Sequence, residues 1–264
     1  MFDLKHVEAE GARFTKEAGE LLGVELTPEA STKLFLASMG PVRSELYRSC
    51  LFYGQEADKC RSSGAYFACC IMQASAIESL LAVLCLTSQK EIENSELNKK
   101  FKRGKGYEER VLKADFQDYI DVASHLGWVP SDAVANDLLV AAMQDFPLVV
   151  ANLYPDFSEE DRHDKVERFG QNPGIEMLRV LQHMRNFVHG SRWARVGITA
   201  SVHDLESDSK FAFVVASQVM FCLTKTFIKL ATEGLTKANE IRGKLSPEAF
   251  EAARTQILTM MNQR

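Results

Sequence analysis

An arginine and a histidine lie four residues apart in the segment HMRNFVHG, which covers residues 183–190. Arg185 offers a planar fork of N–H donors that fits a phosphate group, and His189 can take or give a proton near neutral pH. Such a pair is the minimal equipment for metal-free attack of a ribose 2′-OH on its adjacent phosphate. The amide of Asn186, which follows Arg185 directly, can position the phosphate or the imidazole.

The residues around this pair predict a helix that ends just after it. Pro173 is typical of a first helical turn, and Gly190 is typical of the position that follows a helix. A helix over 174–189, with about 100° per residue, puts Arg185 and His189 together on its apolar face. The helix therefore presents two polar side chains to the side that faces the core.

A cation on a core-facing stripe is costly unless an opposite charge or an acceptor meets it. Two interpretations stay open. In the first, a ligand anion such as an RNA phosphate lies between Arg185 and His189. In the second, Arg185 pairs with a buried acid such as Glu78, and His189 caps carbonyl groups at the helix end.

Helix signals dominate the rest of the chain. Thr27 and Ser246 each precede a Pro-Glu pair, which is typical of a capped helix start. Only the segment 196–203 alternates like a strand, and one short strand cannot build a sheet. The fold class is therefore predicted to be all-α, with helices over 5–22, 28–39, 42–60, 63–87, 107–113, 115–126, 132–145, 159–169, 174–189, 208–233 and 247–261.

Residues 64–86 form a long apolar stretch whose single charge is Glu78. The stretch is long enough to span a bilayer. In hydrocarbon, however, the carboxylate would cost about 2–3 kcal/mol, and the alanines of the stretch suit close packing in a protein core. We therefore expect a buried bundle helix and no membrane partner.

The net charge of the 264 residues is −5, so contact with a nucleic acid requires a local basic patch. The segment 99–113, which we call the basic segment, holds seven basic and two acidic side chains. Its alternative interpretation is a solvated connection between two helices. If it binds phosphate, the candidate residues are Lys99, Lys100, Lys102, Arg103 and Lys105.

Two further candidates follow the Arg-Asn-His segment. Trp193 offers a surface on which a base can stack, and Arg195 offers a second cation for its phosphate. The alternative is that the tryptophan packs a loop onto the helices.

Other kinds of chemistry lack their motifs. The six cysteines show no Cys-x-x-Cys spacing, and the six histidines form no His-Glu-x-x-His helix, so no metal site is expected. Glycine-rich loops for nucleotide phosphates are absent, so no cofactor is expected. The amino terminus lacks the layout of a secretory signal, and reduced thiols in the cytoplasm are the expectation.

The sequence RNFVHG, preceded by an amphipathic helix and followed by a long apolar one, resembles the signature of HEPN domains. These are four-helix modules of prokaryotic toxins, defence systems and some eukaryotic ribonucleases. The long apolar stretch is similar to the early helix of such domains, whose acid, here Glu78, lies inside the bundle. The resemblance implies an up-and-down helical bundle over 62–233, with a helical extension at 1–61 and a further helix at 234–264.

The resemblance also implies a homodimer in which two motifs face one cleft, and it places the site at Arg185, Asn186 and His189. The family usually has a longer spacing between its arginine and histidine than the three residues found here. The short spacing keeps both side chains on one helical face. It changes the direction of the imidazole by about 100° for each missing residue, which is a departure from the usual cleavage geometry of the family.

Two functional hypotheses follow. The first is a metal-independent endoribonuclease in which His189 transfers protons, Arg185 stabilises the phosphorane and Asn186 positions the phosphate or the imidazole. The alternative is a non-catalytic helical module that binds RNA, a nucleotide or a partner protein in a defence or stress system.

Overall fold

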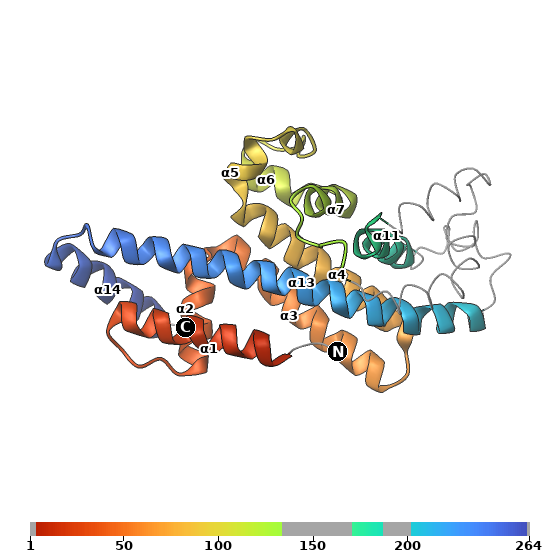
Figure 1. Cartoon of the computed structure of the whole chain (residues 1–264), viewed down its shortest axis with the longest axis horizontal. Helices are drawn as coiled ribbons and strands as arrows, with labels where there is room; N and C mark the ends of the chain where they lie inside the picture. Colours follow the sequence, from red (N-terminus) through yellow and green to blue (C-terminus); the bar gives the residue numbers. More distant parts are fainter. Residues whose placement is uncertain (1–3, 134–170, 187–201, 263–264) are drawn as a thin grey trace. The chain divides into compact units, whose positions relative to one another are not determined.

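The computed structural model describes residues 4–133, 171–186 and 202–262, and every regular element in them is a helix (Figure 1). The all-α prediction is confirmed. The elements are α1 (Leu4–Leu22), α2 (Pro28–Ser38), α3 (Pro41–Ser62), α4 (Tyr66–Thr87), α5 (Gln89–Glu93), the 3-10 helix η1 (Glu96–Lys99), α6 (Tyr107–Leu112), α7 (Phe116–His125), α11 (Pro173–Asn186), α13 (Val202–Arg242) and α14 (Pro247–Asn262).

Both predicted capped starts are present. The Thr27 hydroxyl oxygen accepts a hydrogen bond from the backbone N–H of Ala30 at 3.2 Å, at the start of α2. The Ser246 hydroxyl oxygen accepts one from the N–H of Ala249 at 3.2 Å, at the start of α14. Each cap satisfies a backbone donor that the first helical turn leaves without a partner.

The prediction of a helix over 208–233 was wrong at both ends, because α13 runs from Val202 to Arg242. Gly234 lies inside this helix, and no atom is within 4 Å of the place where a Cβ would stand. A glycine inside a helix costs only about 1 kcal/mol, so it does not stop the helix. The short helices α5 and η1 were not predicted.

Several predictions fall on residues outside the described ones. These include the helix over 159–169 and nearly all of the helix over 132–145. The first six residues of the strand-like segment 196–203 also lie outside, and its last two begin α13, where they are helical.

The chain divides into two compact units, each described here by itself. The first contains residues 1–46 and 224–264, and the second contains residues 47–223. The domain boundaries expected after residues 61 and 233 stay a prediction.

The second unit is built around α4, which packs against α6, α7 and α11, while α7 and α11 also pack against each other. The side chains of Ile77, Leu80, Leu81 and Leu84 on α4 are fully buried. Among the described residues, α4 alone is long and apolar enough to cross a membrane, and most of it is buried within the protein. Its apolar composition is therefore that of a core helix, as predicted.

The basic segment is anchored to this core by aromatic residues. The Phe101 side chain is fully buried, with its ring centroid 6.1 Å from that of Tyr107 and 6.3 Å from that of Tyr119. The Tyr107 hydroxyl donates to the carbonyl of Cys85 at 2.8 Å, and the Tyr119 hydroxyl donates to the carbonyl of Val111 at 2.6 Å. The segment is thus an ordered part of the second unit.

The start of α11 packs against Val129, which lies in the segment that follows α7. The Asn172 side chain accepts from the N–H of Ile175 at 3.2 Å and donates to the carbonyl of Val129 at 3.0 Å. A Cβ at Gly174 would lie 2.5 Å from Cγ1 of Val129, so only glycine fits this close approach. These contacts set the position of the helix that carries Arg185.

The first unit has its own apolar core. Phe35 on α2 makes edge-to-face contacts with Phe14 on α1 and Phe227 on α13, at centroid distances of 5.3 and 5.2 Å. The Arg254 Nε on α14 donates to the carbonyl of Leu22 at 2.5 Å, at the end of α1.

Candidate anion-binding site

Arg185, in the last turn of α11, forms an ion pair with Glu78 of α4. Its Nη1 donates a hydrogen bond to Oε2 of that carboxylate, and its Cζ lies 5.8 Å from the ring centroid of Phe116 on α7. The side chains of Arg185 and Glu78 are 35% and 26% exposed. This is the pairing of the second interpretation above, and it joins the helix of the Arg-Asn-His segment to the central helix.

Burial raises the pKa of the Glu78 carboxyl above its ordinary value of 4.5. The Arg185 guanidinium acts in the opposite direction, and the nearby carboxylate of Asp115 adds to the increase. The net direction is upward because removing the carboxylate from water costs more than its single cation returns.

The other predicted residues near Arg185 have different outcomes. Asn186 is the half-buried last residue of α11. His189, Trp193 and Arg195 lie outside the described residues, so their roles stay predictions.

A pocket of about 250 Å³ in the second unit gathers much of the basic segment. Three of its cations, Lys100, Lys102 and Arg103, were predicted from the sequence as phosphate-binding residues. Lys99 and Lys105 were predicted with them but do not line it. The complete lining is Lys100, Lys102, Arg103, Arg110, Lys113, Ala114, Asp115 and Asp118, and we call this the basic pocket.

The sequence analysis missed Arg110 and Lys113 because the chain must turn back to bring them to the pocket. Gly104 makes that turn with φ 146°, and a Cβ there would lie 2.8 Å from the backbone nitrogen of Arg110. The backbone N–H of Lys105 then donates to the Glu109 carboxylate at 2.8 Å. The signal was present in the sequence as a glycine between two groups of basic residues.

Three of the five cations already have acidic or amide partners. Lys100 Nζ lies 2.7 Å from Oδ2 of Asp121 on α7. Arg110 donates to the Asn98 side chain at 2.9 Å and to the Glu93 carboxylate at 3.3 Å. Lys113 forms an ion pair with Glu109, one turn earlier.

Lys102 and Arg103 differ from these three. Both are exposed, and within the described part of the chain neither side chain has a hydrogen bond or an ion pair. An incoming anion can therefore bind them without breaking an existing contact. Their long side chains lose rotamer freedom only when the anion arrives.

The two acids of the basic pocket cap the start of α7. Asp115 and Asp118 form a capping box, in which the side chain of each residue accepts a hydrogen bond from the backbone N–H of the other. The Asp118 carboxylate accepts the Asp115 N–H at 3.2 Å. They reduce the positive charge of the lining but leave an excess of cations.

Helix α7 contributes to the lining of the basic pocket and also packs against α11. On one side, Asp121 binds Lys100, and its other oxygen lies 3.7 Å from Nη2 of Arg179 on α11. Near its start, Asp115 lines the pocket and the next residue, Phe116, lies under Arg185. The two clusters of predicted residues therefore belong to one part of the second unit.

Nucleophilic thiol chemistry is not supported at the four buried cysteines. Burial raises the pKa of Cys50 to about 12 and that of Cys69 to about 11, and it raises those of Cys70 and Cys85 further. These side chains are protonated near neutral pH and fill the core. In residues 4–133, 171–186 and 202–262, no group of three His, Cys, Asp or Glu is placed to hold a metal ion.

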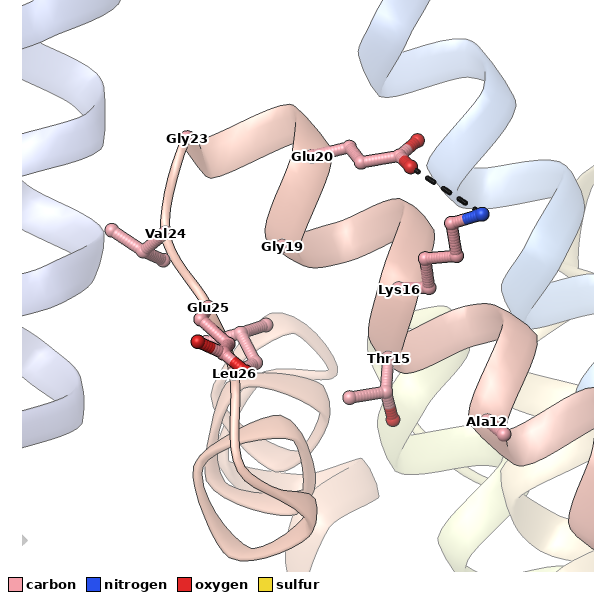
Figure 2. A pocket seen from close by; sticks show the side chains of 9 residues that line it. All are labelled: Ala12, Thr15, Lys16, Gly19, Glu20, Gly23, Val24, Glu25 and Leu26. Atoms are coloured by element: carbon pink, nitrogen blue, oxygen red, sulfur yellow. Dashed lines mark ion pairs between the residues drawn. The ribbon is translucent and has the colours of Figure 1, made fainter.

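A larger pocket of about 650 Å³ lies in the first unit, between α1 and the residues that follow it (Figure 2). Its charged lining includes Lys16 and Glu20, which form a long ion pair at 3.8 Å, and Glu25. The Thr15 hydroxyl is occupied by a hydrogen bond to the Ser31 hydroxyl at 2.9 Å. Its described lining holds one cation, two carboxylates and no cysteine or histidine, so the basic pocket is the stronger candidate site for an anion.

No protein-family model, curated protein or solved structure matches this chain.

Proposed function

We propose that this chain is a HEPN-like helical module that binds RNA through its phosphate groups at the basic pocket. The observation that carries the proposal is the convergence of five cationic side chains on one pocket of a chain with net charge −5. Phosphate contacts give binding that does not depend on base sequence. RNA is the anion that the resemblance to HEPN domains favours.

In this proposal Arg185 holds α11 onto α4 instead of acting on a substrate. Its guanidinium is occupied by the Glu78 carboxylate and lies over the ring of Phe116. An arginine that stabilises a reacting phosphate must have donors directed at that phosphate. The pairing therefore supports binding over cleavage.

The proposal is tested by the affinity of the purified chain for a mixed-sequence single-stranded RNA, measured by fluorescence anisotropy. Lys102→Ala with Arg103→Ala removes the two cations that have no partner, and we expect the Kd to rise on the order of tenfold. The matched control is Lys99→Ala with Lys105→Ala, which removes the same charge from the same segment outside the pocket. Equal affinities of the two double variants would overturn the proposal.

A metal-independent endoribonuclease is the second candidate function. It is favoured by the position of Arg185 at the end of α11, where about a third of the side chain is exposed and the chain continues to His189. It requires cleavage of RNA in excess EDTA, with 2′,3′-cyclic phosphate ends, and loss of cleavage in His189→Ala. The binding module predicts that the RNA stays intact.

We place this module in the cytoplasm, because all six cysteines are free thiols. The resemblance to HEPN domains further supports a homodimer. It also supports a partner protein, in a defence or stress system, as an alternative to RNA.

A further inference from the structure

We propose that the basic pocket takes a terminal phosphate monoester of RNA, in preference to a phosphodiester inside the strand. This inference rests on the proposed function, since it names the part of the RNA that the same site binds. It is argued from the pocket's charge, its size and the types of its lining residues.

The charge of the lining fits a dianion. Three of the five lining cations are paired with acids outside the lining, so Lys102 and Arg103 supply two positive charges that no described acid neutralises by direct contact. A phosphodiester carries one negative charge, whereas a phosphate monoester carries close to two at neutral pH. The monoester gains more from each cation, and Lys102 with Arg103 can contact it without leaving another partner.

The size of the basic pocket fits a chain end. The volume of about 250 Å³ is below the roughly 300–1,000 Å³ of pockets that hold drug-sized molecules. The pocket is also partly enclosed. A phosphate inside a strand brings a nucleotide on each side to its site, whereas a terminal phosphate brings only one and so needs less space.

The types of lining residue fit phosphate and exclude base recognition. None of the described residues that line the pocket is aromatic, so no base can stack there. Arginine and lysine side chains are donors for oxygen acceptors, and Arg103 supplies a planar fork that matches two phosphate oxygens. The pocket therefore recognises the phosphate and leaves the bases outside.

The test compares three RNAs of one sequence, carrying a 5′-phosphate, a 3′-phosphate or hydroxyls at both ends. We expect one phosphorylated RNA to bind the full chain on the order of tenfold more tightly than the hydroxyl form at pH 7.5, and the tighter one identifies the end that is bound. Lys102→Ala with Arg103→Ala should lose this preference, and Lys99→Ala with Lys105→Ala should keep it.

The pH dependence separates a dianion site from general attraction to RNA. The second ionisation of a phosphate monoester has a pKa of about 6, so the preference should decline as the pH falls from 7.5 to 5. No histidine is among the described lining residues, whose charged groups are Lys100, Lys102, Arg103, Arg110, Lys113, Asp115 and Asp118. A preference that stays constant over this range would contradict the dianion site.

Two failures are distinguishable. Equal affinity for the three RNAs would overturn the terminal-phosphate inference and leave RNA binding in place. No measurable binding of any of them would overturn the proposed function itself.

Discussion

Glu78 and Arg185 join α4 to α11 through a contact between two partly buried charges. The sequence identified both residues, because one is the single charge in a long apolar stretch and the other lies on an apolar helical face. It could not decide between a protein carboxylate and a ligand as the partner, since both satisfy a guanidinium. That choice depends on how α4 and α11 pack.

The raised pKa of Glu78 gives a signed prediction for stability. The folded chain binds a proton at this carboxyl more readily than the unfolded chain does, so its contribution to stability falls as the pH rises above 4.5 through the raised pKa. We expect the free energy of unfolding of the wild type, relative to Glu78→Gln, to increase as the pH is lowered from 7 to 5. Denaturant titrations of both proteins across this range measure the difference. A decrease would mean that Arg185 lowers the pKa below its ordinary value.

At the scale of elements, the position of α11 depends on the absence of a side chain at Gly174. A Cβ there would lie 2.5 Å from Cγ1 of Val129, whose branched side chain is buried. We expect Gly174→Ala to lower the free energy of unfolding by about 1–3 kcal/mol through overpacking. Gly54→Ala on α3, in the same unit, is the control. No atom lies within 4 Å of its Cβ position, and higher helix propensity should stabilise it by up to about 1 kcal/mol.

Thermal or denaturant unfolding of the two glycine variants measures this difference. Equal stability of Gly174→Ala and the wild type would show that α11 moves away from Val129 at little cost. RNA binding of Gly174→Ala then reports whether the basic pocket depends on the position of α11.

Local signals in the sequence predicted most helices. They did not predict every helix end, nor which basic residues the folded chain brings together. Thr27 and Ser246 marked helix starts because a cap acts within a few residues of itself. The predicted helix end at residue 233, just before Gly234, was wrong, and a glycine weakens a helix without stopping it. In the same way, composition found Lys102 and Arg103, but Arg110 joined them only through the turn at Gly104.

At the scale of the whole molecule, an acidic chain carries a local cluster of cations, which we propose binds an anion. The net charge of −5 opposes general attraction to RNA, so binding must come from a few phosphate contacts at short range. Each contact releases counterions, and for a single strand the slope of log affinity against log salt changes by about 0.7 per phosphate. Salt dependence therefore counts the contacts that the basic pocket makes.

The most direct measurement is this slope for wild-type chain and for Lys102→Ala with Arg103→Ala, using single-stranded RNA. If the basic pocket holds RNA phosphates, the wild type binds with a marked salt dependence, and the variant's slope is smaller by about 0.7 to 1.4. The Lys99→Ala with Lys105→Ala control should keep a slope close to that of the wild type. Equal slopes for all three proteins would contradict the account, because the pocket would then contribute no phosphate contact.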